Sequence, residues 1–299
     1  MTERVPSHTR TVLLESDDIG VIDYVCRGHD SRWTVCDPHV GQALIFVRKG
    51  GFWRRIRGLP TWLDPGMAFL RRDEGEEEVA HPAAGGDVNT VVTVSPPLVA
   101  ELLGGDPRLP DRVVFTSPYT DLHHRRLLTS CARDGTGEAA DQALTLVAWV
   151  LNRAEPDRIR AGRPGTPAAR KLIVDRAREA LANDPSVSLL GLSRLVSVSA
   201  YHLSRIFKLV TGQTLSVYRR QVRIRSALDL LLEGQVDLAT IAAAAGFSDH
   251  AHLTRTFRTE LGDVPSEIRG RIWPGDGARS PSLVEPNTRI QAPVRPGHD

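Results

Sequence analysis

The chain has 299 residues, of which 41% are hydrophobic and 25% are charged. This composition is typical of a soluble, core-forming protein, and the length predicts two domains. No stretch approaches the roughly 18 consecutive apolar residues of a transmembrane helix, and the first residues lack the apolar segment of a secretory signal. Three cysteines, Cys26, Cys36 and Cys131, are too few for a disulfide framework. These features exclude a membrane-spanning or disulfide-stabilised protein and predict a cytoplasmic one.

The N-terminal part, residues 1–160, is predicted to consist mainly of β-strands. Short β-branched or apolar runs alternate here with turns rich in Gly, Pro and Asp, and such a series predicts a small barrel or sandwich. A helix is predicted from about Glu138 to Ala154, and the pair His123-His124 is expected to cap a helix or to face solvent. The predicted strands are Thr11 to Leu14, Gly20 to Val25, Ala43 to Val47, Met67 to Leu70, and Val91 to Val94.

The rest of the chain has a different pattern. Residues 161–170 are rich in Gly, Pro and Ala and are predicted to be a linker between the domains. Helical periodicity begins at about Lys171, with a first helix to Asn183, and a helical domain is predicted over residues 171–272. Residues 273–299 lack sustained periodicity and are predicted to be a disordered tail.

An internal repeat lies within the helical part. The segment 203–208 (LSRIFK) with Gly212 recurs fifty positions later as 253–258 (LTRTFR) with Gly262. Each copy predicts a helix-turn-helix, a short apolar helix followed by a turn and a second, amphipathic helix. In the first copy Ser199 is the predicted N-cap, and in the second Ser248 or Asp249 takes this role after a turn at Gly246.

The repeat and its charge favour DNA as the partner. Between Asp184 and Asp229 the chain holds seven Lys and Arg residues and no acid, which is typical of a phosphate-facing surface. A connecting helix from about Thr214 to Glu233 is about 28 Å long at 1.5 Å per residue, close to one DNA turn of about 34 Å. It can therefore hold both second helices on successive major grooves. The alternative is a helical repeat that binds no nucleic acid.

The outward side chains of the two second helices are the predicted DNA contacts. Arg205 and Arg255 are candidates for bidentate contacts to guanine, with phosphate neutralisation as the equally weighted alternative. Lys208, Arg258 and Arg220 are predicted to contact the DNA backbone. The complete predicted interface is Ala200, Tyr201, Ser204, Arg205, Lys208, Arg220, His250, Ala251, Thr254, Arg255 and Arg258.

These residues resemble the AraC/XylS transcriptional regulators over about 171–270. The segment 241–249 (IAAAAGFSD), the second copy of the repeat and 265–269 (PSEIR) are similar to the family signature, as are Arg223, Ala227 and Leu231 on the connecting helix. The resemblance implies seven helices, two helix-turn-helix units and base contacts from Tyr201, Ser204, Arg205, His250, Ala251 and Arg255. The first turn departs from the family, because Ser197 stands where glycine is frequent, and Ala251 is a poor hydrogen-bonding residue.

The resemblance extends to what the N-terminal part does. By its position it resembles a cupin-like effector-sensing or dimerisation domain, so the fold class is α+β with an N-terminal cupin-like β-barrel, trailing helices and an all-α C-terminal domain. This implies a ligand-responsive activator with a small-molecule effector, RNA polymerase as a partner and a homodimeric state. Candidate ligand contacts are His39, Trp53 and His81, although core packing is favoured over ligand contact for each of them.

Two alternatives remain open for the N-terminal part. It can serve only to dimerise the chain, or it can be a metal-dependent cupin-type enzyme with His29, His39 and His81 plus Asp30 or Glu78 as ligands. The H-x-H pattern that places ligands on one strand face is absent, and Cys26, Cys36 and His39 lack a fourth zinc ligand at suitable spacing. The sequence therefore predicts no enzyme activity, no metal and no cofactor.

Overall fold

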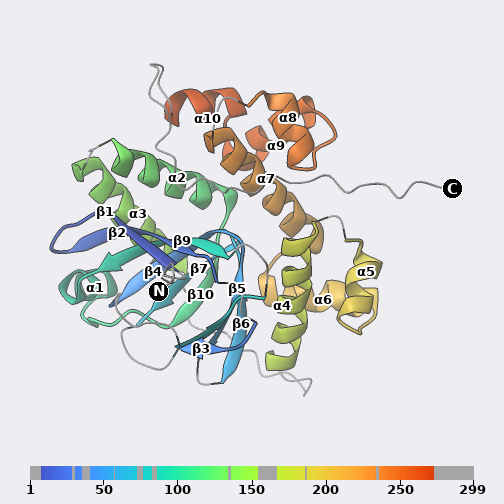
Figure 1. Cartoon of the computed structure of the whole chain (residues 1–299), viewed down its shortest axis with the longest axis horizontal. Coiled ribbons are helices and arrows are strands. Elements are labelled where there is room, and N and C mark those ends of the chain that lie inside the picture. The colour runs from blue at the N-terminus through green and yellow to red at the C-terminus, as the bar shows by residue number, and fades with distance from the viewer. Residues whose placement is uncertain are drawn as a thin grey trace, which may run out of the picture.

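The computed structural model describes residues 8–28, 31–35, 41–56, 58–72, 77–82, 86–133, 136–153, 167–185, 187–233 and 236–272. Ten strands and three helices form the N-terminal part of this described chain, and seven helices follow (Figure 1). The strands are β1 His8–Leu14, β2 Ile19–Cys26, β3 Thr34–Val35, β4 Ala43–Lys49, β5 Phe52–Ile56, β6 Leu59–Leu63, β7 Met67–Arg71, β8 Glu77–Ala80, β9 Asp87–Val94 and β10 Arg112–Phe115. The helices are α1 Pro96–Leu103, α2 Pro118–Ala132, α3 Thr136–Arg153, α4 Pro167–Asn183, α5 Leu189–Leu195, α6 Ala200–Thr211, α7 Leu215–Glu233, α8 Leu238–Ala244, α9 His250–Leu261 and α10 Pro265–Ile272.

The strands form two sheets. One has the order β1-β2-β9-β4-β7-β10 and the other the order β3-β8-β5-β6, and every pairing is antiparallel. The described strands give no ladder that joins the two sheets into a closed cylinder. The described strands therefore do not close the cupin-like barrel that the resemblance implied, and the pair of sheets corresponds to the sandwich that the strand pattern allowed. The division into a β-rich N-terminal part and a helical C-terminal part is confirmed.

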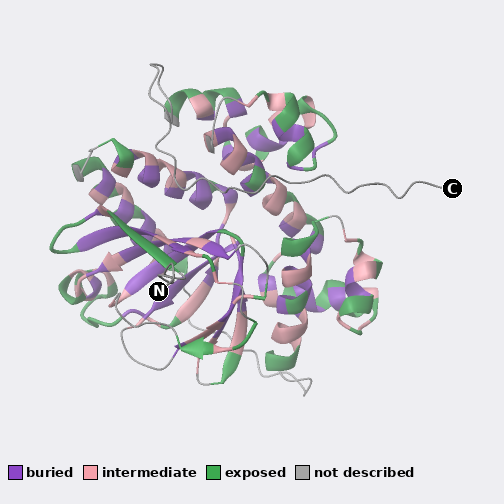
Figure 2. Cartoon of the chain, in the orientation of Figure 1, coloured by how far each residue is buried: buried purple, intermediate pink, exposed green. Residues whose placement is uncertain are grey.

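Alternation along the strands explains how the N-terminal core is layered. In β4, Leu44 and Phe46 point to one face of the larger sheet, and Ala43 and Ile45 point to the other. The first face packs against α3, which contributes Val147 and its neighbours, and the second face packs against residues of β5 and β6. Both faces of the larger sheet are thus covered, as Figure 2 shows by the concentration of buried residues there.

The seven C-terminal helices build two small cores that share α7. The first core joins α4, α5 and α6 to the start of α7, where Tyr218 packs on Phe207 with ring centroids 5.4 Å apart. The second joins the end of α7 to α8, α9 and α10 and includes Ile224 and Phe257. Because α7 contributes to both cores, it fixes the two groups of helices relative to each other.

Most predicted helices are found, with small differences at their ends. Helix α9 spans His250–Leu261 as predicted. Helix α4 begins at Pro167, so the last four positions of the predicted linker are helical, since proline is well accommodated at the first turn of a helix. The remainder of the predicted linker and the predicted tail, residues 161–166 and 273–299, lie outside the described residues. None of the described helices is long and apolar enough to cross a membrane.

Candidate nucleic-acid interface

The first helix-turn-helix consists of α5 and α6. Ser188 caps α5, and Ser199 caps α6 by accepting a hydrogen bond from the backbone N–H of His202 (3.2 Å), as predicted. Leu203 and Phe207 are fully buried, as is expected of two positions four residues apart on the inner face of a helix. Helix α6 ends at Gly212, whose φ of 74° suits the left-handed conformation of a C-terminal cap.

The second helix-turn-helix consists of α8 and α9 and repeats this design. Asp237 caps α8, and Asp249 caps α9 with its Oδ1 2.6 Å from the backbone N of His252. The sequence left Ser248 and Asp249 open as the cap, and the structure selects Asp249. Leu253 and Phe257 are again fully buried and Gly262 ends the helix, so the two copies present equivalent helices.

The turns of the two helix-turn-helix units differ in length by one residue. Ser197 and Gly246 are the positions after each first helix, with φ of 55° and 76°, and Ser197 is the one non-glycine residue with positive φ among those described. Val198 separates Ser197 from the N-cap Ser199, whereas two residues, Phe247 and Ser248, separate Gly246 from its N-cap. The first turn is therefore shorter and strained, because a serine side chain in this conformation costs about 1 kcal/mol relative to glycine.

The predicted DNA contacts on α6 and α9 lie on the outer faces of these helices. Tyr201 has 73% of its surface exposed, and Figure 2 shows exposed positions along the outer sides of the C-terminal helices. Ala200, Ala251 and Thr254 are half-buried, and the hydroxyl of Thr254 bonds to the backbone carbonyl of His250. The remaining exposed positions of the predicted contact set on these helices are Ser204, Arg205, Lys208, His250, Arg255 and Arg258.

A basic cavity lies between α7 and the second helix-turn-helix. It has a volume of about 280 Å³ and is open to solvent. Arg220, a predicted phosphate contact, lines it and also pairs with Glu260 of α9 at 2.6 Å. Three guanidinium groups on one side of a cavity favour an anionic occupant such as a phosphate. The lining consists of Ser216, Arg219, Arg220, Arg223, Phe247 and His252.

Only some of the basic residues between Asp184 and Asp229 lie on the surface. Arg225 is buried, and its Nε donates to Oδ2 of Asp121 on α2 at 2.5 Å. Arg219 donates to the backbone carbonyl of Val187. The expectation that the whole run faces phosphate is therefore wrong for Arg225, because an acid from the N-terminal part, about a hundred positions earlier, neutralises it.

A buried ionic cluster joins the first group of helices to the smaller sheet. Arg178 of α4 has no exposed surface and pairs with Asp64, in the turn between β6 and β7, at 2.7 Å and with Asp175 at 3.0 Å. Tyr218 of α7 donates its hydroxyl to the same Asp64 carboxylate at 2.6 Å. Burial alone would lower the pKa of Arg178, but the charges of Asp64 and the neighbouring groups raise it. Lys171 completes the cluster, with Nζ 2.6 Å from Asp175.

A second junction joins α2 to α7. Here the Arg225 guanidinium donates to Asp121 and to the backbone carbonyl of Thr116 (2.8 Å), and Arg125 of α2 pairs with Asp229 of α7 at 2.5 Å. Burial raises the pKa of Asp121 although Arg225 and Arg125 oppose this effect. Helix α7 is thus attached to the N-terminal part near both ends. The sequence gives no local signal for either junction, since the partners lie about a hundred or more positions apart.

The histidine pair on α2 differs from expectation. His124 is fully buried and stacks on Phe46 with ring centroids 4.5 Å apart. Burial, reinforced by the charges of Arg125 and Arg48, holds its pKa well below 6.5, so it is neutral at pH 7. The prediction of a capping or solvated pair is therefore wrong for His124.

The predicted ligand contacts lie in different surroundings. Trp53 packs against Trp62 and donates from its indole nitrogen to Glu179 of α4 at 3.1 Å, so it belongs to the junction between the two parts. His81 lies beside Cys26 and Asp87. Glu78, a candidate ligand in the enzyme alternative, accepts hydrogen bonds from Arg55 instead. His29, Asp30, Cys36 and His39 lie outside the described residues.

Comparison with known proteins defines the class of the C-terminal part. Residues 192–271 match a family described as a helix-turn-helix domain. The transcriptional regulator GlxA of Rhizobium meliloti is 33% identical over 81 residues, 27% of this chain and 25% of that protein. The transcriptional regulator RipA of Corynebacterium diphtheriae is 30% identical over 144 residues, 48% of this chain and 40% of that protein. The chain thus spans less than half the length of either relative.

A solved structure is similar over part of the chain. The AraC-like transcriptional activator CuxR is 14% identical and covers 69% of this chain and 76% of its own, with a TM-score of 0.35 that is too low to bear on function. The C-terminal part of the chain is a DNA-binding helix-turn-helix domain. Its matched residues include both helix-turn-helix units that the repeat predicted.

Proposed function

We propose that the protein is a sequence-specific DNA-binding transcription regulator of the AraC/XylS type. The observation that carries this proposal is the pair of equivalent helix-turn-helix units that share α7. Helix α7 has 19 residues and is about 28 Å long, which suits two recognition helices in successive major grooves. GlxA and RipA, to which the chain is similar over 27% and 48% of its length, are both named transcriptional regulators.

Base contacts and backbone contacts are assigned to different side chains. Arg205 and Arg255 are exposed at equivalent positions of α6 and α9, where a guanidinium can form two hydrogen bonds with guanine. Lys208 and Arg258 lie one turn further along and neutralise phosphates. Arg220 and the basic cavity beside it offer a further phosphate contact.

The N-terminal part is proposed to control the position of the DNA-binding helices. The ionic cluster around Arg178 and the junction at Arg225 attach α4 and α7 to it, so a small-molecule effector that shifts the sheets relative to α2 shifts the reading helices as well. Activation through RNA polymerase, a cytoplasmic location and a homodimeric state belong to the same proposal. The alternative, in which this part only dimerises the chain, differs in that no small molecule changes DNA affinity.

The proposal is tested by selecting duplexes from random DNA with the full chain. Affinity for the selected duplex is then measured by fluorescence anisotropy at several salt concentrations. We expect specific binding whose logarithmic affinity falls linearly with the logarithm of salt, with a slope of about −0.9 per neutralised phosphate. The double variant Arg205→Ala, Arg255→Ala should lose specificity while retaining salt-dependent binding. Absence of any salt-sensitive affinity in the unaltered chain would refute the proposal.

A further inference from the structure

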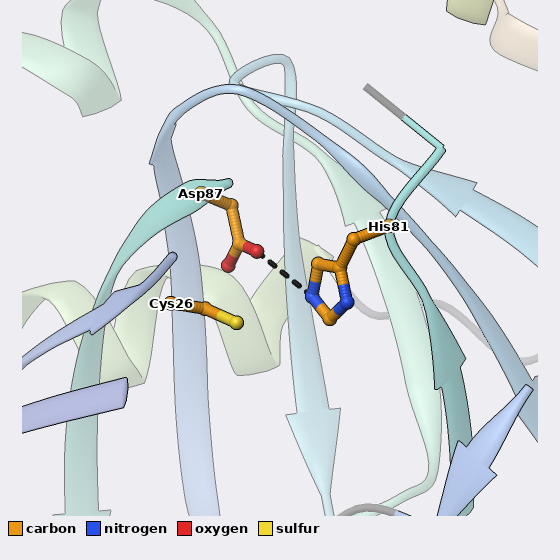
Figure 3. Close-up of side chains that lie close together, drawn as sticks. All are labelled: Cys26, His81 and Asp87. Atoms are coloured by element: carbon orange, nitrogen blue, oxygen red, sulfur yellow. Dashed lines mark ion pairs between the residues drawn. The ribbon is translucent and has the colours of Figure 1, made fainter. Parts of the chain in front are cut away.

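Three side chains that can bind a metal ion meet at one edge of the β-rich part (Figure 3). Cys26 ends β2, Asp87 begins β9, and His81 follows β8 of the other sheet. The sulfur, imidazole and carboxylate ligand atoms all lie within 4.8 Å of one another, and His81 Nε2 is 2.9 Å from Asp87 Oδ2. We propose that this cluster binds one divalent ion of the zinc type. The sequence predicted no metal, so the proposal departs from that expectation.

Strand pairing explains why these residues meet. Cys26 and Asp87 are direct partners in the antiparallel β2–β9 ladder, so their side chains leave the same face of the sheet. Gly86 precedes Asp87 with φ of 69°, and a Cβ at this position would lie 1.8 Å from the carbonyl oxygen of Cys26. Only glycine therefore allows the start of β9 to approach the end of β2 this closely.

The carboxylate has the surroundings of a metal ligand. Asp87 is 2% exposed. Its Oδ1 accepts a hydrogen bond from the side-chain amide of Asn89, the kind of second contact that orients a metal-binding carboxylate. Its Oδ2 has no aligned hydrogen-bond donor among the described residues and faces the imidazole of His81 (Figure 3). Without a metal ion, the cluster would be a His81–Asp87 ion pair with the Cys26 sulfur as a second hydrogen-bond partner of the imidazole.

The geometry fits a zinc ion after a small adjustment. Zinc binds sulfur at about 2.3 Å and nitrogen or oxygen at about 2.0–2.2 Å in a tetrahedral arrangement. In such an arrangement the nitrogen and oxygen ligands are about 3.4 Å apart, so His81 and Asp87 need to separate by about 0.5 Å. Cys26 and His81 are half-buried, which leaves one side of the cluster open for a fourth ligand such as water.

The chemical types of the three ligand atoms indicate which metal ion the cluster would bind. A thiolate with an imidazole is unsuited to Mg²⁺ or Ca²⁺, which prefer oxygen ligands alone. One sulfur, one nitrogen and one oxygen suit Zn²⁺ and its spectroscopic substitute Co²⁺. The inference does not depend on DNA binding, because all three ligands lie in the N-terminal part.

The test is a metal titration of the full chain after chelator treatment and buffer exchange. We expect one Zn²⁺ per chain by elemental analysis and competition with a chromophoric chelator. With Co²⁺ we expect a thiolate-to-metal charge-transfer band in the near ultraviolet. Cys26→Ser should abolish that band, and Asn89→Ala should weaken Zn²⁺ binding by about 10- to 100-fold.

Matched variants and a folding check make the outcomes decisive. Cys131→Ser removes the other described free cysteine, which is also half-buried, and should leave both the band and the affinity unchanged. Circular dichroism in the absence of metal should show each variant folded, and Asp87→Asn provides a second ligand variant if Cys26→Ser fails to fold. Less than stoichiometric zinc, or a band that persists in Cys26→Ser, would overturn the proposal and leave the cluster as a His–Asp ion pair.

Discussion

Replacing Arg178 with methionine should weaken the attachment of the DNA-binding helices to the N-terminal part. Arg178 is fully buried and is the shared partner of Asp64 and Asp175, so its removal leaves two buried carboxylates near each other. Losing one member of such a buried pair costs about 3–5 kcal/mol. Tyr218 still donates to Asp64 and Lys171 to Asp175, so we expect the lower end, about 3 kcal/mol.

A double-mutant cycle in urea separates the ionic contribution from packing. Asp64→Asn in the Arg178→Met background removes one of the stranded charges and should recover part of the loss, a coupling of about 1–3 kcal/mol. Arg271→Met is the matched control, because Arg271 pairs with Asp263 at the exposed surface, and its unfolding midpoint should barely change. A loss below about 1 kcal/mol for Arg178→Met, or no coupling to Asp64, would refute the reasoning about this junction.

Three further predictions follow from single residues. Ser197→Gly should raise the free energy of unfolding in urea by about 1 kcal/mol, because glycine adopts a positive φ without steric cost. Gly246→Ala should lower the free energy of unfolding for the same reason. Equal effects of the two substitutions would contradict strain at Ser197. The pKa of His124 is lowered by burial from 6.5, so stability present above pH 6.5 is lost as the pH falls. Between pH 7.5 and 5.5 the chain should lose about 1 kcal/mol more than His124→Phe in urea denaturation, and equal losses would contradict this. Arg205→Ala should lower operator affinity by about 1–3 kcal/mol and relax the preference at one base position in footprints. Lys208→Ala should weaken binding to all duplexes alike. An unchanged base preference in Arg205→Ala would contradict base contact by Arg205.

The helix-turn-helix units could be predicted because their signals are local. The N-cap, the buried pair and the glycine that ends the helix fall within about fifteen residues in each copy, and the repeat shows them twice. Even the departure at Ser197 could be identified from the sequence, and the structure gives this residue the backbone conformation of the equivalent Gly246.

The strands of the smaller sheet are harder to predict from the sequence. Strand β5 contains Arg54 and Arg55, whose charges are typical of a loop. Their partners are Glu77 and Glu78, on a strand more than twenty positions away. Strand identity here depends on pairing across the sheet, which no local pattern reveals.

The two junctions and the candidate metal cluster also depend on contacts between residues that are far apart in the sequence. Asp64 has the sequence context of a turn, and nothing near it indicates that it accepts a hydrogen bond from Tyr218, 154 positions later. Asp87 likewise follows two glycines in a predicted turn, and only the strand register places it opposite Cys26. From the local sequence alone, Arg225 is therefore predicted to lie on the surface and no metal site is predicted.

The most direct measurement of the central claim concerns the spacing of the two DNA contacts. If α7 holds both recognition helices on one face of a duplex, inserting about 5 bp between the two halves of the selected site moves one half to the opposite face. Affinity by anisotropy should then fall to that of a duplex with one half-site, and Arg255→Ala should have no further effect. Unchanged affinity after the insertion would contradict simultaneous binding by α6 and α9.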